Sequence, residues 1–161
     1  MFHLEQALEF DHSAEHVWPY LIAFERVPLW ETGVEEIRVV TPGPPAIGSE
    51  VVARRRFGGR TTILAGTITA FDEGRSATVV LRGGPLALVT AEYAVEPIVG
   101  DRDRSIVTYS GHGALAGPMR VLHPLIGWIG RRQARRNLEA LRARIDAGIP
   151  PTSPALPGGR D

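Results

Sequence analysis

The sequence predicts an α+β domain in which a curved antiparallel sheet of about seven strands wraps around one long C-terminal helix, with two short helices after the first strand. Two observations support this fold class. Strand-like runs separated by turn residues fill residues 34–112, and the pattern changes to that of a single helix after Pro118. The apolar face of the sheet has to be covered, and this helix is the only long element available to cover it.

The N-terminal segment predicts a strand followed by two short helices. In residues 2–10 apolar side chains alternate with polar ones, as in a strand with one buried face, and only Gln6 interrupts that face. Ser13 is a favourable N-cap for a helix over residues 13–22. A second helical turn is expected at residues 27–30.

Six further strands are expected in the middle of the chain. Gly58-Gly59 and Gly83-Gly84 suit two-residue hairpin turns, because glycine adopts positive φ angles without strain. Neighbouring strands are therefore expected to pair in sequential antiparallel order. The turn signals between the strands are PGPPAIG, FGGR, FDEGR, RGGP and VGDRDR.

The C-terminal region predicts the covering helix and a tail. Gly148 and Pro150-Pro151 end the helix near residue 147. We expect residues 1–147 to form one domain of the type described above, and residues 148–161, which are rich in proline and glycine, to be disordered. One apolar stripe of the helix is spaced to face the sheet, namely Ala134, Leu138, Leu141 and Ile145.

Six arginines within residues 131–145 raise the question of a nucleic-acid partner. The chain has 18 basic and 18 acidic residues and a net charge of +0, whereas nucleic-acid binders usually carry surplus positive charge. Glu139 follows Arg135 by four residues, so part of the charge is paired within the helix. We therefore expect a solvent-exposed helix face and no nucleic-acid partner, with an anionic protein or lipid surface as lesser alternatives.

The composition argues against several classes of protein. The chain has no cysteine, which excludes disulfides, a thiolate nucleophile and sulfur-ligated metals. The N-terminus lacks a signal-peptide pattern, and the most apolar stretch, VLHPLIGWIG, is much shorter than the roughly 20 residues of a membrane span. HExxH, GxSxG and a phosphate-binding glycine loop are absent. We expect a cytoplasmic protein with no metal, no cofactor and no integral membrane association.

The inward face of the predicted sheet carries many small side chains. Such a face leaves volume unfilled, and protein interiors tolerate voids poorly unless a ligand or water occupies them. An apolar cavity with a few polar groups is the usual form of a small-molecule site. The more apolar alternate sets of the strands are Val51, Ala53, Arg55, Phe57, Ala77, Val79, Leu81, Ala87, Val89, Ala91, Tyr93, Val95, Val107 and Tyr109.

Arg55 is the most informative polar residue of this inward face. An inward guanidinium needs a carboxylate, phosphate or enolate partner to offset its desolvation. The alternative is that strand curvature leaves Arg55 in solvent beside Arg54 and Arg56. The nearby acidic cluster Glu31, Glu35 and Glu36 is interpreted as a solvated face.

The first half of the long helix carries two glycines and a broad apolar surface. Gly127 and Gly130 each weaken a helix by roughly 1 kcal/mol relative to alanine. They indicate either a close backbone approach or a pocket that needs the room. Trp128 and Trp30 are candidate aromatic walls of such a pocket, and the apolar surface of residues 122–129 could also pair two copies in a homodimer.

Several segments together resemble the SRPBCC superfamily, which includes START lipid-binding domains, polyketide cyclase/dehydrase-like proteins and pathogenesis-related allergens. The resemblance covers residues 2–147 and implies the helix-grip fold, in which the sheet wraps around the C-terminal helix and leaves a deep apolar cavity between them. The segments that carry it are FDHSAEHVWPYL, FERVPLWETGVEEI, IGSEV, LAGTITAFDEGRSATVVL, AEYAVEPIVG, SIVTYSG and ARRNLEALRARI.

This resemblance implies a domain that binds a hydrophobic or amphipathic small molecule, such as a lipid, a quinone or a polyketide-like compound, between sheet and C-terminal helix. The alternatives are an aromatase/cyclase-like enzyme, in which Arg55 and Tyr93 stabilise an enolate, and a protein-interaction module. Both an enzyme and a binding protein fit the sequence. The expected ligand-binding residues are Trp30, Arg55, Val79, Val89, Ala91, Tyr93, Tyr109, Gly127, Trp128 and Gly130.

Overall fold

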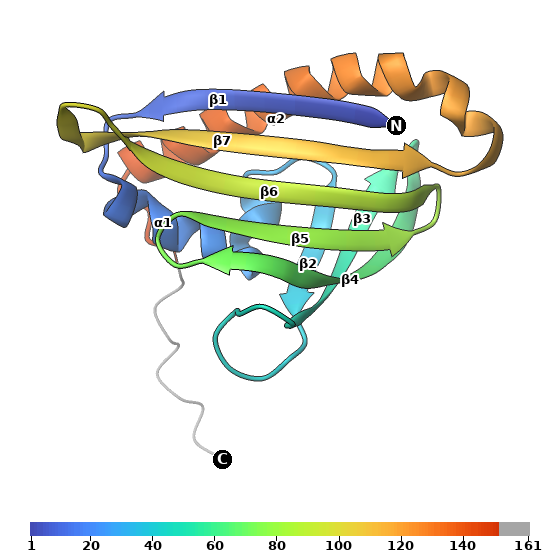
Figure 1. The fold of residues 1–161 in the computed structure, drawn as a ribbon, viewed down its shortest axis with the longest axis horizontal. Coiled ribbons are helices and arrows are strands. Elements are labelled where there is room, and N and C mark those ends of the chain that lie inside the picture. The colour runs from blue at the N-terminus through green and yellow to red at the C-terminus, as the bar shows by residue number, and fades with distance from the viewer. Residues whose placement is uncertain (152–161) are drawn as a thin grey trace.

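The computed structural model describes residues 1–151, and the predicted α+β fold class is confirmed (Figure 1). Of the predicted tail, residues 152–161 lie outside the described residues. In chain order the elements are β1 (Phe2–Phe10), α1 (Ala14–Ile22), η1 (Phe24–Leu29), β2 (Val34–Val39), β3 (Glu50–Phe57), β4 (Arg60–Asp72), β5 (Ser76–Gly83), β6 (Leu86–Ile98), β7 (Asp101–Leu115), η2 (Gly117–Leu122) and α2 (His123–Asp146), where η denotes a 3-10 helix.

The seven strands form one antiparallel sheet in the order β1-β7-β6-β5-β4-β3-β2. From β2 to β7 each strand pairs with the next, as the hairpin signals predict, whereas β1 pairs with β7 at the far edge. Register shifts in β2, β4 and β6 add to the bend of the sheet. Figure 1 shows α2 running along β1 at the upper edge of the molecule.

Close contact between β4 and β5 requires a glycine in β4. A Cβ atom on Gly66 would lie 1.8 Å from the carbonyl oxygen of Val80. No side chain fits at that distance, so glycine is the residue that allows the two backbones to approach here. Gly113 of β7 has a similar role, since a Cβ there would lie 2.4 Å from the carbonyl oxygen of Leu88.

The short N-terminal helices cover the concave face of the sheet. Ser13 caps α1 as predicted, because its hydroxyl oxygen accepts a hydrogen bond from the His16 amide at 3.2 Å. On its inner side α1 buries Val17 and Leu21. The Tyr20 hydroxyl donates a hydrogen bond to the carbonyl oxygen of Ile149 at 2.6 Å, which attaches the chain after α2 to α1.

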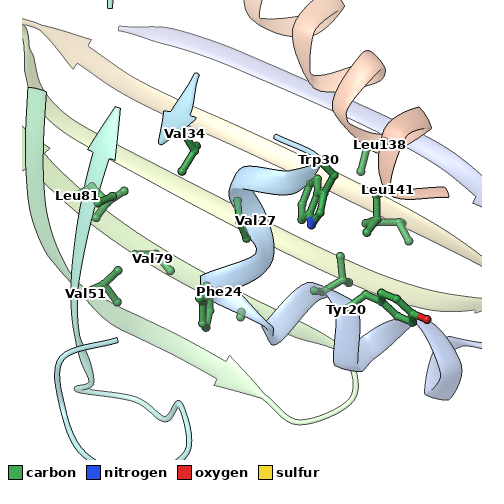
Figure 2. Close-up of a cluster of buried hydrophobic side chains, with 14 of the residues drawn as sticks. Tyr20, Phe24, Val27, Trp30, Val34, Val51, Val79, Leu81, Leu138 and Leu141 are labelled. Carbon is green, nitrogen blue, oxygen red and sulfur yellow. The ribbon is translucent and has the colours of Figure 1, made fainter. Parts of the chain in front are cut away.

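The predicted apolar stripe of α2 lies in the core. Ala134, Leu138, Leu141 and Ile145 are each at most 4% exposed. Leu138 and Leu141 face the same interior as Trp30, which follows η1 (Figure 2). The second half of α2 therefore packs against the sheet and the N-terminal helices.

None of the helices within residues 1–151 is both long and apolar enough to cross a membrane.

Candidate functional site

A small internal cavity lies between η1 and the concave face of the sheet, and its volume is about 40 Å³. A single water needs about 10–15 Å³ of cavity volume, so a cavity of this size holds only a few waters. Small-molecule sites usually have volumes of roughly 300–1,000 Å³, so the cavity has to widen before a ligand enters. The lining residues are Phe24, Val27, Glu31, Val34, Ile37, Ala53, Arg55, Val79, Leu81, Ala91, Tyr93 and Tyr109.

Four polar side chains meet at this otherwise apolar cavity, and one of them, Glu31, contacts two of the other three. Arg55 Nη1 on β3 lies 3.3 Å from Glu31 Oε1. The Tyr93 hydroxyl on β6 donates a hydrogen bond to Glu31 Oε2 at 2.5 Å. Since Glu31 is 6% exposed, its carboxylate is held almost entirely by these two partners. The loop after η1 is thereby fixed to two strands that are not neighbours in the sheet.

Aromatic rings surround the ion pair. The rings of Tyr93 and Tyr109 have centroids 4.8 Å apart, and the ring of Trp30 meets Tyr93 edge-on at 5.6 Å. The guanidinium of Arg55 lies 5.8 Å from the ring centroid of Phe57. This packing holds the polar groups in one geometry and limits the access of water to them.

Burial and charge determine the protonation of the cluster. Burial raises the pKa of Tyr93 well above its ordinary value, and the negative charge of Glu31 raises it further. The same two causes raise the pKa of Tyr109. Burial alone would lower the pKa of Arg55, but Glu31 and the two tyrosines more than offset this, so the net shift is upward. At neutral pH the site therefore contains two neutral phenols and a cationic guanidinium.

One hydrogen-bond donor of the cluster is unused. Arg55 Nε is buried and has no hydrogen-bond partner among residues 1–151. A buried donor without an acceptor is unfavourable by about 1–3 kcal/mol. An oxygen atom of a guest molecule in the cavity would satisfy it. The site therefore offers a fixed N–H donor to a ligand that is otherwise apolar.

The structure brings half of the predicted site residues together. Arg55 faces the cavity, with a quarter of its side chain exposed, while Arg54 and Arg56 pair with Glu35 on the surface. The solvent alternative is therefore wrong for Arg55. Trp30 packs behind Tyr93 and does not line the cavity. The predicted residues that line the cavity are Arg55, Val79, Ala91, Tyr93 and Tyr109.

The predicted residues on α2 lie elsewhere, because α2 lies over β1 and contributes no residue to the cavity lining. A Cβ on Gly130 would lie 2.4 Å from Leu4 Cδ2, and one on Gly127 would lie 3.5 Å from the His3 carbonyl oxygen. Neither glycine lines the cavity. Gly130 is packed tightly against the Leu4 side chain, whereas a Cβ on Gly127 would lie at ordinary contact distance. Trp128 is 56% exposed on the outer face, which corrects its placement as a cavity wall.

Two further predictions about the interior are corrected by the structure. The sequence predicts a cavity between the sheet and the C-terminal helix, whereas residues of η1 and β2 close the observed cavity. Val89 is buried between Gly113 of β7 and Leu81 of β5, and of these residues only Leu81 lines the cavity.

Glu31 is the cavity residue that the sequence pattern does not predict. The cluster of Glu31, Glu35 and Glu36 is predicted to be a solvated face, but Glu31 is buried and ion-paired, whereas Glu36 is half exposed. Two signals were present in the sequence. An inward Arg55 needs a carboxylate, and Glu31 directly follows Trp30, a candidate aromatic wall of the pocket.

Among residues 1–151 no group of three or more histidine, aspartate or glutamate side chains is arranged to hold a metal ion. The cavity contains one carboxylate, already paired with a cation and a phenol. Its donors suit an organic oxygen acceptor.

Comparison with known proteins gives one family and a consistent fold. The family model for polyketide cyclase/dehydrase and lipid transport proteins matches residues 1–146. A START superfamily protein from Mycobacterium smegmatis superposes with a TM-score of 0.77 and 14% identity over 92% of this chain and 100% of that one. The Zhui aromatase/cyclase from Streptomyces sp. R1128 superposes with a TM-score of 0.70 and 12% identity over 92% of this chain and 95% of that one. For the major latex-like protein 151 of Panax ginseng the TM-score is 0.62 and the identity 16%, over 92% of this chain and 97% of that one. No curated protein sequence matches.

Proposed function

Because the chain belongs to the family of polyketide cyclase/dehydrase and lipid transport proteins, we propose that it binds a hydrophobic small molecule with a carbonyl or phenol oxygen beneath η1. The family match bears out the resemblance found in the sequence, and the helix-grip fold is that of the START superfamily. The observation that carries the proposal is the buried, unpartnered Arg55 Nε at an apolar cavity. A ligand oxygen would accept its hydrogen bond while the apolar body of the ligand contacts the valines and alanines.

The charge of the site favours a ligand without a carboxylate. Glu31 already compensates the positive charge of Arg55 at 3.3 Å. A fatty-acid carboxylate beside Arg55 would place a second negative charge near Glu31, which is unfavourable in a buried site. A quinone, ketone or phenol offers an acceptor oxygen and adds no charge. Among the candidate ligand classes, quinones and polyketide-like compounds therefore fit better than free fatty acids.

Ligand entry requires one wall of the cavity to move, and η1 is the wall best suited to do so. It is a six-residue 3-10 helix that contains Pro28, and 3-10 hydrogen bonds have poorer geometry than α-helical ones. Phe24 of η1 lines the cavity and also an adjoining open groove near Val39 and Pro45. Rotation of this ring would join the two spaces.

Binding of three compounds of similar shape tests the ligand class. Naphthoquinone should bind at least about tenfold more tightly than naphthalene, because only the quinone supplies an acceptor for Arg55 Nε. Naphthoate should bind more weakly than naphthoquinone because of its charge. Quenching of tryptophan fluorescence measures each affinity, since Trp30 packs against the site. Equal binding of naphthoquinone and naphthalene, or no loss of the difference in Arg55→Met, would contradict the proposal.

A change at Phe24 tests the movable wall. Phe24→Ala should increase the rate of naphthoquinone association, because it removes the ring between the cavity and the groove. Leu29→Ala is the matched control, since Leu29 lies in the same helix but is 52% exposed. Stopped-flow fluorescence measures both rates. An unchanged rate for Phe24→Ala would show that ligands enter elsewhere.

A cyclase activity is the second candidate, favoured by donors from two strands at one cavity. Arg55 Nε and the Tyr109 hydroxyl could stabilise the enolate oxygen that forms when a poly-β-ketone loses a proton to water before ring closure. The Tyr93 hydroxyl already donates to Glu31 and would position that carboxylate. A cyclase should lose turnover in Tyr109→Phe while still binding naphthoquinone. Incubation with a short poly-β-ketone and chromatography of the products distinguishes the two functions, because a binding protein gives the same products as buffer alone.

A further inference from the structure

The outer side of η2 and of the first half of α2 is unusually apolar for an exposed surface. In Figure 1 this segment is the orange part at the upper right of the molecule. We call residues 119–136 the η2–α2 surface. Its apolar side chains are between 39% and 81% exposed, namely Met119, Val121, Leu122, Leu125, Trp128 and Ile129. Single exposed apolar residues are common, but six from one short segment indicate a binding surface.

The same surface carries a local excess of positive charge. Residues 117–138 contain no acidic residue, although the net charge of the whole chain is +0. Of the five arginines in residues 117–138, only Arg135 forms an ion pair within residues 1–151, with Glu139 at 3.2 Å. Arg131 and Arg132 line an open groove beside Trp128. The five arginines are Arg120, Arg131, Arg132, Arg135 and Arg136.

The apolar and cationic groups share one face of the helix. Leu125, Trp128 and Ile129 are followed at helical spacing by Arg132 and Arg136, and all five are exposed. The opposite face is buried through Gly127, Ala134 and Leu138. Exposed apolar residues with a tryptophan, bordered by arginines, are the composition of helices that lie at a membrane–water interface.

We propose that the η2–α2 surface docks this protein on an anionic lipid surface. The apolar side chains would enter the boundary between headgroups and acyl chains, and the arginines would contact the anionic headgroups. A second copy of the chain is a poorer occupant, because residues 117–138 contain five arginines and no carboxylate, so two-fold pairing of this face would oppose two cationic surfaces. A nucleic acid would leave the central apolar side chains without a matching contact.

The proposed docking surface adjoins the interior site. Met119 lines a groove together with Phe57 and Pro85, and the Phe57 ring is the one that lies 5.8 Å from the Arg55 guanidinium. Phe57 therefore borders both the groove beside the docking surface and the polar end of the cavity, whereas ligand entry is assigned to the Phe24 wall. The docking proposal extends the proposed function but is tested without any ligand.

Vesicle binding tests the proposal directly. The protein should sediment with vesicles of phosphatidylglycerol and phosphatidylcholine at least about tenfold more strongly than with phosphatidylcholine alone, and salt should weaken this binding. Tryptophan emission should shift to shorter wavelength on binding. The shift should vanish in Trp128→Phe, because Trp18 and Trp30 are 5% and 4% exposed and already shielded.

Two triple variants separate a local effect from a change in net charge. Substituting Arg131, Arg132 and Arg136 by glutamine should weaken partition about a hundredfold, from the contribution of three arginines near an anionic surface. Substituting Arg75, Arg82 and Arg102 by glutamine removes the same charge from exposed positions on other elements and should leave partition nearly unchanged.

Three results would overturn the docking proposal. The first is no partition into anionic vesicles at low salt. The second is an equal loss in the two triple variants. The third is self-association that Leu125→Asp abolishes while vesicle binding of that variant is unchanged, which would assign the surface to a second copy. None of these results depends on naphthoquinone binding, so failure here and failure of the proposed function are distinguishable.

Discussion

The interior beneath the sheet is built in two different ways. Under the second half of α2, Phe10, Val107 and Leu141 are completely buried and pack apolar surface on apolar surface. Under η1, Glu31 and Arg55 form an ion pair beside an unfilled cavity. The region under α2 stabilises the fold by tight apolar packing. The region under η1 is packed less tightly and presents polar groups in fixed directions. The fold tolerates this less stable region because the region under α2 supplies most of the stability.

Truncation in the packed region should have the largest effect. Leu141→Ala should lower the free energy of unfolding by about 2–5 kcal/mol, because it removes buried contacts and leaves a cavity. Denaturant titration measures the change. Leu125→Ala, on the exposed side of the same helix, is the control and should stay within about 0.5 kcal/mol of wild type. Similar losses in both variants would mean that the two faces of α2 do not differ as described.

Neutralising the buried carboxylate should have an intermediate effect. Glu31→Gln should lower the free energy of unfolding by about 1–3 kcal/mol, because Arg55 and Tyr93 lose a charged partner. Glu35→Gln is the matched control, since Glu35 pairs with Arg56 at the surface and should contribute less than about 1 kcal/mol. Equal losses in the two variants would remove the distinction between the interior pair and the surface pair.

Alkaline pH should weaken the cavity region selectively. The pKa values of Tyr93 and Tyr109 are raised in the folded protein, so their stabilising effect is complete below the ordinary tyrosine pKa of about 10 and is lost as pH rises toward the folded values. The chain has no lysine or cysteine, so tyrosine is the only type of side chain that ionises near this pH. Unfolding free energies at neutral and alkaline pH should therefore converge in the Tyr93→Phe, Tyr109→Phe double variant. If the free energy of unfolding of the double variant fell with rising pH as steeply as that of wild type, the pH dependence could not be assigned to these two tyrosines.

The two glycines of α2 should give the smallest effects, with opposite tendencies. Gly127→Ala should stabilise the protein by up to about 1 kcal/mol, because its Cβ would lie at ordinary contact distance from the His3 carbonyl oxygen. Gly130→Ala should not, because its Cβ would displace the buried Leu4 side chain. Thermal unfolding compares the two. Stabilisation by both would show that the contact between α2 and β1 is loose.

The sequence predicts the secondary structure better than the interior. Alternation and glycine pairs are local signals, so they place the strands and hairpins correctly. Alternation fails at Ala87, which was expected to face inward but is exposed, because a register shift between Leu86 and Leu88 interrupts the period of β6. The two glycines of α2 fit either a close approach to the sheet or a pocket, and only the position of α2 over β1 decides between these interpretations.

The candidate site is predicted in part for a similar reason. Arg55, Tyr93 and Tyr109 follow from the inward alternation of three strands. Glu31 lies in the loop after η1, where no period indicates which way a side chain points. Its partnership with Arg55 depends on how η1 folds back over the sheet, which is a tertiary property.

The pairing of β1 with β7 has a consequence for how the chain acquires its structure. Phe2 lies opposite Gly113, so β1 can pair with β7 only after nearly the whole domain has been synthesised, whereas β2 to β7 can assemble from successive hairpins. Because α2 packs on β1, the helix depends on the same late event. Until then the edge of β7 stays open, and this interval is when the nascent protein is most vulnerable to aggregation.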